Sequence, residues 1–492
     1  MDTNKNTIIE TLLNGECVTL ECKRAKSEVP KSVWETYSAF ANTIGGVILL
    51  GIEENRKESD KKKRFQIIGV DDAQKIVNDF WNTINSDKVN ENILASSNVE
   101  TVEINGVQIV CIHVPQADWR IKPIYLNGNV YKGTYRRNHE GDYHCTERQV
   151  RAMIRDSFED GNDGMLLEHY DMNDIDLDTL HRYRTLFQFR NDGHVWNEAD
   201  DKTFLKNLGG YIIDRATGKE GLTMAGLMMF GKGLSVQERF ANFRMDYLDF
   251  CNLIGDERYS DRLTYDGRWE NNLYQFFSRV IPKVTADLPR PFHMEGIQRV
   301  DDTPQHKAVR EAFTNAIIHS DLLMDAGILR VEKHDDRLCF RNPGLLKLHV
   351  EMIYEGGNSK ARNPRIQNML RMVGYGENVG SGFPTIISAW KEAHWGEPEL
   401  KNKFEIDEVE LVLPIPVRGA NDRVNDSRND RINSSMMVTL TIVRSNPGIQ
   451  RKGISNISGK SISTIDRHLA ILVKEGLIEH RDSDKTGGYY AK

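Results

Sequence analysis

Alternating apolar and polar residues in the first third of the chain predict short strands mixed with helices. Apolar and polar side chains alternate along residues 99–114, as in two strands, on either side of Asn105-Gly106. This dipeptide is a strong β-hairpin signal. Residues 31–41 have the spacing of a helix and precede an uninterrupted apolar stretch at 47–52. This pattern predicts an α+β domain over residues 1–157.

The pattern becomes mostly helical between residues 166 and 289, where residues 176–187 and 270–281 are candidate helices. No catalytic constellation is found there. We therefore expect a mostly helical connector over residues 158–290. Mixed helix and strand signals then return and delimit a third domain over residues 291–417.

Residues 418–436 are polar, alternate in charge and contain few apolar side chains, so they cannot bury a core and are expected to form a flexible linker. Beyond the linker, residues 437–492 give the signals of three helices followed by two short strands. This order is typical of a winged helix-turn-helix. The helices are expected at 437–443, 449–454 and 461–475, and the strands at 477–480 and 488–491.

The third of these helices has the pattern of a DNA-recognition helix. Its buried stripe is predicted to be Ile465, Leu469 and Leu472. Residues 451–492 contain eight basic and five acidic residues, a local positive excess that favours DNA. The same fold also serves as a protein-interaction or dimerisation module. The expected nucleic-acid contacts, near the helix start that enters a major groove, are Ser463, Thr464 and Arg467.

The composition limits the class of protein. A chain of 492 residues with a net charge of -7 and 28% charged residues is an ordinary soluble protein, so any nucleic-acid surface has to be local. The six cysteines are scattered without a C-x-x-C pair, which favours reduced thiols in a cytosol. Without a signal-like start or an apolar run near 20 residues, we expect a cytoplasmic protein with no membrane partner.

Three carboxylates are candidates for a metal site in the first domain. Glu16 and Glu21 are five residues apart, Lys23 shares a strand face with Glu21, and Glu53 follows the apolar stretch. Acids at strand ends can hold Mg²⁺ or Mn²⁺ against a phosphodiester, and a nearby lysine can stabilise the developing charge. We expect the three acids to converge. The alternative is that Glu16 and Glu21 are surface acids flanking an edge strand.

This segment resembles the Schlafen-type divergent AlbA domain over residues 12–155. An E-x4-E-x-K element, a helix ending in A-N-T-x-G-G (residues 41–46) and an apolar strand ending in an acid recur together in that family. The resemblance implies that Glu16, Glu21 and Glu53 are catalytic, metal-binding acids with Lys23 beside them. Glu53 stands where the family usually has aspartate. Many bacterial members are DNA-binding regulators, so nucleic-acid handling is implied more firmly than cleavage.

Cationic residues of the same domain are candidate partners for nucleic-acid phosphates. Arg136 and Arg137 are the principal ones, in the segment Tyr131-Lys-Gly-Thr-Tyr-Arg-Arg137. The alternative is that these arginines belong to a network of salt bridges at the surface.

The predicted helix at 310–321 carries a second polar constellation. Glu311, Asn315 and His319 recur at every fourth position and therefore along one side, and Asp321 follows just beyond. A carboxylate, an amide and an imidazole in this arrangement could hold a divalent metal with a nucleotide triphosphate and prepare a water. A solvated polar face is the alternative for the stripe taken alone.

The helix and the segment that follows it resemble the GHKL ATP-binding fold, in the divergent form attached to RecG-like bacterial regulators. The resemblance rests on a strand-turn-strand, an Asn342-Pro343-Gly344 turn, and the motifs S-K-A-R-N-P (359–364) and G-Y-G-E-N-V-G-S-G-F-P (374–384). It implies an α/β sandwich that binds ATP with Mg²⁺, with Glu311 as the general base and Asn315 as the metal ligand. The other implied nucleotide-site residues are His319, Asp321, Asn342, Gly344, Gly380 and Gly382.

These observations predict an α+β multidomain protein made of a Schlafen/AlbA-like domain, a mostly helical connector, a GHKL-like α/β sandwich and a C-terminal winged helix-turn-helix. The leading hypothesis is an ATP-binding bacterial transcription regulator that binds DNA, in which nucleotide state controls the first domain. The alternative is a metal-dependent nuclease that cleaves RNA or tRNA in phage defence or a stress response. GHKL relatives commonly dimerise, so a homo-oligomer is expected.

Overall fold

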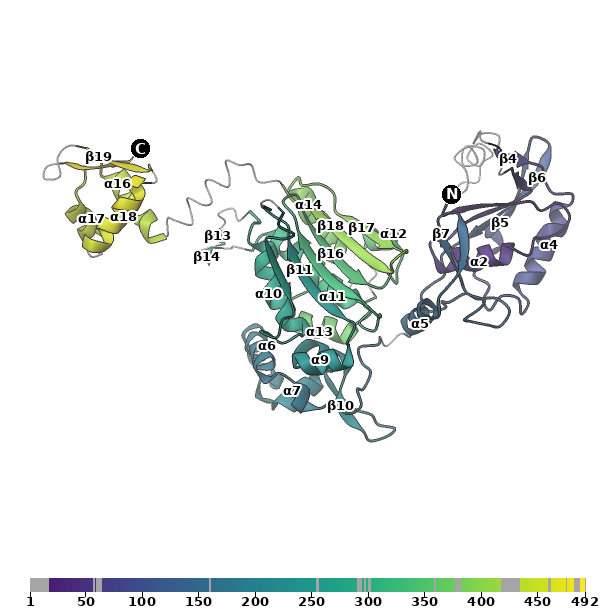
Figure 1. Ribbon diagram of the computed structural model, residues 1–492, viewed down its shortest axis with the longest axis horizontal. Helices are drawn as coiled ribbons and strands as arrows, with labels where there is room; N and C mark the ends of the chain where they lie inside the picture. Colours follow the sequence, from purple (N-terminus) through teal and green to yellow (C-terminus); the bar gives the residue numbers. More distant parts are fainter. Residues whose placement is uncertain are drawn as a thin grey trace. The chain divides into compact units, whose positions relative to one another are not determined.

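The computed structural model divides the chain into two compact units, residues 1–415 and 416–492 (Figure 1). Among the helices of the described part, none is both long and apolar enough to cross a membrane. The residues that the structure describes are 17–55, 58, 64–158, 161–253, 256–289, 294–295, 298–299, 302–357, 360–376, 382–416, 434–458, 462–474, 476–481 and 487–491.

In the N-terminal domain, residues 1–156 of the first unit, the described part contains a four-stranded sheet in the order β1-β2-β6-β5. β1 is parallel to β2, and the other pairs are antiparallel. One face of the sheet packs on α2 and α4, whereas the other face packs on the small β3-β4 sheet. The bounds are β1 (Leu20–Lys23), α2 (Val33–Asn42), β2 (Gly46–Leu50), β3 (Ile52–Glu54), β4 (Phe65–Ile67), α4 (Ala73–Ile84), β5 (Val99–Ile104) and β6 (Val107–Val114).

Glycine and asparagine set the turns of this domain. The hairpin predicted at Asn105-Gly106 is present between β5 and β6, and both residues have positive φ angles of 52° and 81°. The apolar stretch 47–52, expected as one strand, is divided because Gly51 has a φ of 98° between β2 and β3. The domain ends with β7 (Tyr135–Asn138), β8 (Gly141–His144) and α5 (Glu147–Asp156).

The rest of the first unit, here the central domain (residues 161–415), is built on a six-stranded sheet in the order β12-β11-β15-β16-β18-β17. β11 and β15 are parallel, and the other neighbours are antiparallel. Helices α10, α11 and α14 cover one face (Figure 1). The bounds are β11 (Arg244–Asp249), β12 (Asp261–Thr264), α10 (Leu273–Thr285), α11 (Pro304–His319), β15 (Ile328–Lys333), β16 (Arg337–Pro343), α14 (Gly382–Glu392), β17 (Glu399–Lys403) and β18 (Glu408–Pro414).

This sheet crosses the boundary that the sequence predicted at residue 290. β11 and β12 precede that boundary, yet β11 pairs with β15 along its whole length. A single apolar core also extends from Leu167 to Leu413. The expected connector, residues 158–290, is therefore part of the same folded body as the third domain, because strand pairing and core packing both join them. Its other elements are α6 (Leu177–Arg190), α7 (Asp201–Asn207), β9 (Tyr211–Ile213), β10 (Glu220–Leu222), α8 (Met224–Phe230) and α9 (Gly233–Arg239).

The second unit contains three helices followed by a two-stranded antiparallel sheet, in the predicted order. Ile465, Leu469 and Leu472 are buried in its core, as the stripe predicted. Residues 418–433 of the expected linker lie outside the described residues, whereas residues 434–436 already belong to the first helix. The bounds are α16 (Ser434–Ser445), α17 (Arg451–Ser458), α18 (Ile462–Lys474), β19 (Ile478–Arg481) and β20 (Gly488–Ala491).

Candidate functional site

Helix α11 presents one side to the core and the other to a cavity. Its start is fixed by Thr303, whose hydroxyl accepts from the His306 N–H, and by Pro304 at the first helical position. The predicted stripe of Glu311, Asn315 and His319 lines the cavity. These side chains therefore face a cavity and not a flat surface of the protein.

The cavity lies between α11, β16 and α14 and encloses about 910 Å³, its open mouth included. Phe340 and Asn342 of β16 and Phe383 of α14 line it as well. The mixture of apolar walls with a few polar groups is typical of small-molecule sites.

Asn342 is the most informative residue of the cavity. Its side chain is only 4% exposed, and its Nδ2 atom has no hydrogen-bond partner. An unpaired buried amide costs about 1–3 kcal/mol, so its presence favours a ligand that accepts this hydrogen bond. A carboxamide offers one donor and one acceptor side by side, which matches the hydrogen-bonding edge of a purine base.

Glu311 and Asn315 are joined directly. The Asn315 Nδ2 atom donates to Glu311 Oε1 at 3.2 Å, which leaves the Asn315 carbonyl oxygen as a candidate ligand for a cation. Gly382, at the start of α14, faces the same pair: a Cβ there would clash with the Glu311 carboxylate and lie 3.3 Å from Asn315 Nδ2. A larger residue at this position would displace the Glu311 carboxylate from its place beside Asn315.

Two lysines give the cavity a cationic end that sequence reasoning missed. Lys347 and Lys360 both line it. Burial lowers the pKa of Lys347 to about 8, with further lowering by Arg362 and Lys360. Burial, Arg362 and Lys347 together lower the pKa of His319 to about 4, so this imidazole is neutral at pH 7. Lys360 stands inside the quoted S-K-A-R-N-P motif, which was the available signal, whereas Lys347 lies in no motif that we recognised.

Two residues predicted for the nucleotide site lie elsewhere, and Gly380 lies outside the described residues. Asp321 and Gly344 border a second cavity, between the two domains of the first unit. The Asp321 carboxylate pairs with Arg155 Nη2 of α5 at 2.7 Å. Gly344 has a φ of 92° and leaves room for Arg362, whose Nη1 would be 2.7 Å from a Cβ. In this structure both residues therefore lie at the domain contact and not in the lining of the first cavity.

The N-terminal acids are held by cations of their own. Glu21 Oε1 is 2.5 Å from Lys23 Nζ, as expected for residues on one strand face, and Glu21 Oε2 is 2.7 Å from Arg137 Nη2. Glu53 Oε1 is 2.9 Å from Arg24 Nη1. Glu16 lies outside the described residues, so the convergence of the three acids stays a prediction.

Arg136 and Arg137 do not offer their charges to a surface ligand in this structure. Arg137 is 1% exposed, and its Nη1 is 2.9 Å from Asp142 Oδ1. Arg136 Nη1 is 2.6 Å from Asp407 Oδ1 of the central domain. Their assignment as phosphate contacts is therefore corrected: the two arginines form ion pairs, and these are buried rather than at the surface.

The A-N-T-x-G-G motif has a structural explanation. The Asn42 Oδ1 atom accepts from Ile124 N at 2.8 Å and its Nδ2 donates to Ile124 O at 2.8 Å, which fastens a loop to the end of α2. The Thr43 hydroxyl accepts from Arg137 N at 2.9 Å. Gly45 has a φ of 76°, and a Cβ there would lie 2.8 Å from Val114 O. The motif therefore positions Arg137, which in turn binds Glu21.

In the second unit, Thr464 and Arg467 lie in the first half of α18, and Arg467 is exposed. The side chain of Ser463 lies outside the described residues. Their role as nucleic-acid contacts stays a prediction.

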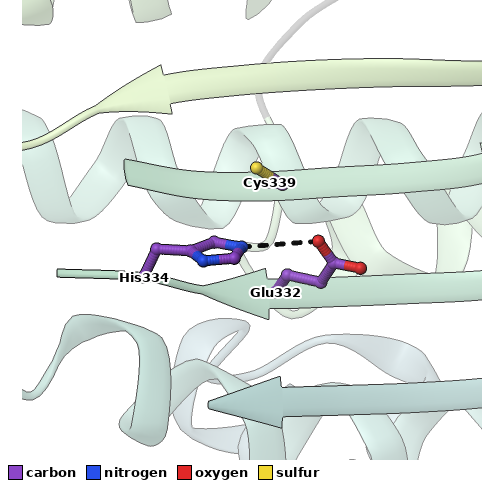
Figure 2. A group of neighbouring side chains, drawn as sticks. All are labelled: Glu332, His334 and Cys339. Atoms are coloured by element: carbon purple, nitrogen blue, oxygen red, sulfur yellow. Dashed lines mark hydrogen bonds and ion pairs between the residues drawn. The ribbon is translucent and has the colours of Figure 1, made fainter. Parts of the chain in front are cut away.

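One further group brings potential metal ligands together. Glu332 of β15, His334 directly after β15 and Cys339 of β16 have ligand atoms within 4.8 Å of one another (Figure 2). Glu332 Oε1 is also 3.2 Å from Arg341 Nη1 and 3.8 Å from Arg330 Nη1, and burial raises the pKa of the Cys339 thiol. Since the carboxylate is already compensated and the thiol is held protonated, we assign the group to an ion-pair network on the sheet.

Comparison with known families found three matching segments. Residues 16–146 match the family "Schlafen, AlbA_2", residues 151–246 match a domain of unknown function (DUF8451), and residues 328–413 match "Putative ATP-dependent DNA helicase recG C-terminal" (HATPase_c_4). These matches confirm a Schlafen/AlbA-like N-terminal domain and an ATPase-like segment in the central domain.

Two solved structures are similar only at low scores. The crystal structure of the DIP2311 protein from Corynebacterium diphtheriae is 17% identical with a TM-score of 0.40, over 99% of this chain and 96% of that chain. The solution structure of the N-terminal domain of a "Putative ATP-dependent DNA Helicase RecG-related Protein" from Nitrosomonas europaea is 25% identical with a TM-score of 0.23, over 29% of this chain and 94% of that chain. No curated protein matches the chain.

Proposed function

We propose that this chain is an ATP-binding, nucleic-acid-binding regulator whose nucleotide occupies the cavity between α11, β16 and α14. The observation that carries the proposal is the buried, unpaired amide of Asn342 in a cavity that also holds Glu311 and Asn315. The family matches support the same reading, because they combine an ATPase-like segment with a Schlafen/AlbA-like domain.

The residues present fit a nucleotide with Mg²⁺. Asn342 would bind the base, the Asn315 carbonyl oxygen would face the metal, and Lys347 with Lys360 would bind the phosphates. The metal would neutralise phosphate charge when bound. Glu311 is the candidate base for an attacking water, held in place by the Asn315 amide. The fold class we propose for this site is the GHKL-like sandwich.

We favour regulation over RNA cleavage for the N-terminal domain. A metal at Glu21 would have to displace two cations, because Lys23 and Arg137 lie within ion-pair distance of its two carboxylate oxygens, although Oε2 accepts no hydrogen bond. Arg137 is also paired with Asp142, so Glu21 belongs to a buried ion-pair network. The nuclease alternative requires that network to open.

The affinity for Mg-ATP should fall with rising pH because of Lys347. Its pKa of about 8 reflects burial and repulsion by Arg362 and Lys360, opposed by Asp156 and Asp321. Only the protonated amine attracts phosphate, so we expect up to about tenfold weaker binding at pH 9 than at pH 7. Dissociation constants measured at pH 7, 8 and 9 test this. Lys347→Arg keeps its charge and should flatten the dependence; parallel curves for the two proteins would contradict the assignment.

The second unit is proposed to be a winged helix-turn-helix that binds duplex DNA through α18. Replacing exposed Arg467 by alanine should weaken DNA binding and reduce the slope of log K against log salt by about 1, since one phosphate contact is lost. Lys474→Ala, at the last residue of the same helix, is the matched control. Equal affinities and equal slopes for Arg467→Ala and the wild type would instead indicate a protein-interaction module.

A further inference from the structure

The cationic end of the nucleotide cavity is also a contact with the N-terminal domain. Trp119 belongs to the N-terminal domain, in the segment between β6 and β7. Its ring centroid is 4.6 Å from Lys347 Nζ and 5.1 Å from Lys360 Nζ. Both distances are within the range of a cation–π interaction. One aromatic ring thus binds two ammonium groups that line the nucleotide cavity.

Several positive charges gather at this end of the cavity. Arg362 adds a third positive charge nearby, but it is committed to Asp156, with two hydrogen bonds of 2.8 Å. The electron-rich face of Trp119 attracts an ammonium group less than a full negative charge does, because the ring offers only a quadrupole. A triphosphate would supply that charge.

We propose that Trp119 and the phosphates of a bound nucleotide compete for Lys347 and Lys360, so that nucleotide binding loosens the contact between the N-terminal domain and the central domain. The inference rests on the proposed nucleotide site. It names the residues through which nucleotide state reaches the N-terminal domain.

Three ion pairs between described residues of the two domains lie outside the lining of the nucleotide cavity. Arg136 binds Asp407, Arg155 binds Asp321, and Arg362 binds Asp156. These ion pairs keep the domains attached when Trp119 is released. The expected change is therefore local to the Trp119 segment, and not a separation of the domains.

Coupling of this kind is reciprocal: if nucleotide weakens the Trp119 contact, loss of Trp119 must strengthen nucleotide binding. We expect Trp119→Ala to tighten Mg-ATP binding by the full chain about three- to tenfold, because the ring no longer holds the two lysines. Trp119→Phe keeps an aromatic face and should give a smaller gain. Ile121→Ala, an exposed neighbour in the same segment, should leave the affinity unchanged.

Isothermal titration of the four proteins with Mg-ATP decides the matter. If the wild type binds Mg-ATP and Trp119→Ala binds it equally or more weakly, the proposed competition is wrong. The proposed nucleotide site is not contradicted by that result. A wild-type chain that does not bind Mg-ATP at all overturns the nucleotide site and the competition together.

A spectroscopic measurement keeps the inference testable if Trp119→Ala fails to fold. Release of Trp119 from two ammonium groups should alter tryptophan emission when Mg-ATP is added. The chain has seven tryptophans, so the change is assigned by difference: it should be present in the wild type and absent in Trp119→Phe. An equal change in both proteins, or none in the wild type at saturating nucleotide, contradicts the release of Trp119.

Discussion

Replacing Asn315 by alanine is expected to abolish measurable Mg-ATP binding, a loss of about a hundredfold or more. The amide is the candidate metal ligand on α11, and its Nδ2 atom also holds Glu311 at 3.2 Å. Without it, the cation loses a protein ligand, and the Glu311 carboxylate loses the donor that positions it, so the metal and the phosphates are no longer held together. Isothermal titration of the full chain measures the loss.

The control for this variant is Thr314→Val. Thr314 is the buried neighbour on α11, its hydroxyl has no hydrogen-bond partner, and valine has nearly the same shape. It should bind Mg-ATP like the wild type. Asn315→Ala binding with unchanged affinity would remove Asn315 from the site, whereas equal losses in both variants would assign the effect to distortion of the helix.

Unlike Asn315→Ala, Glu311→Gln is expected to bind the nucleotide normally. Its rate of hydrolysis should fall by about 10²–10⁴-fold. Glutamine retains an oxygen that can accept from the Asn315 amide, so the site keeps its shape. It cannot take a proton from water, and general-base catalysis typically contributes that factor. The measurement is single-turnover release of phosphate from chain saturated with Mg-ATP. Hydrolysis at the wild-type rate would place the base elsewhere.

Local sequence signals predicted the elements that carry the site. The helix at 310–321 was recognised from its spacing, and its polar stripe does line a cavity. The hairpin at Asn105-Gly106 and the buried stripe of α18 were predicted for the same reason: each depends on neighbours within a few residues. Such patterns are readable without knowing the tertiary fold.

Long-range pairing explains what the sequence could not provide. Arg136 binds Asp407, which is 271 residues away, so nothing near Arg136 in the chain distinguishes a buried ion pair from a phosphate contact. Asp321 was misplaced for the same reason, since its partner Arg155 lies on α5. Strand β11 belongs to the central sheet because it pairs with β15, which lies far from it in the sequence. In each case the deciding interaction is tertiary.

The cationic end of the cavity was missed because lysines are abundant and carry no spacing rule. Lys347 and Lys360 become notable only when the fold places both beside the same cavity and beneath the same tryptophan. Asn342 was considered as a base-binding residue, but its unpaired amide is a property of the folded core and not of the motif.

Isothermal titration of the full-length chain with Mg-ATP tests the central claim most directly. The account predicts saturable binding of one nucleotide per chain, lost in Asn315→Ala and retained in Glu311→Gln. A wild-type chain without saturable binding, or equal binding by the wild type and Asn315→Ala, would contradict a nucleotide site between α11, β16 and α14.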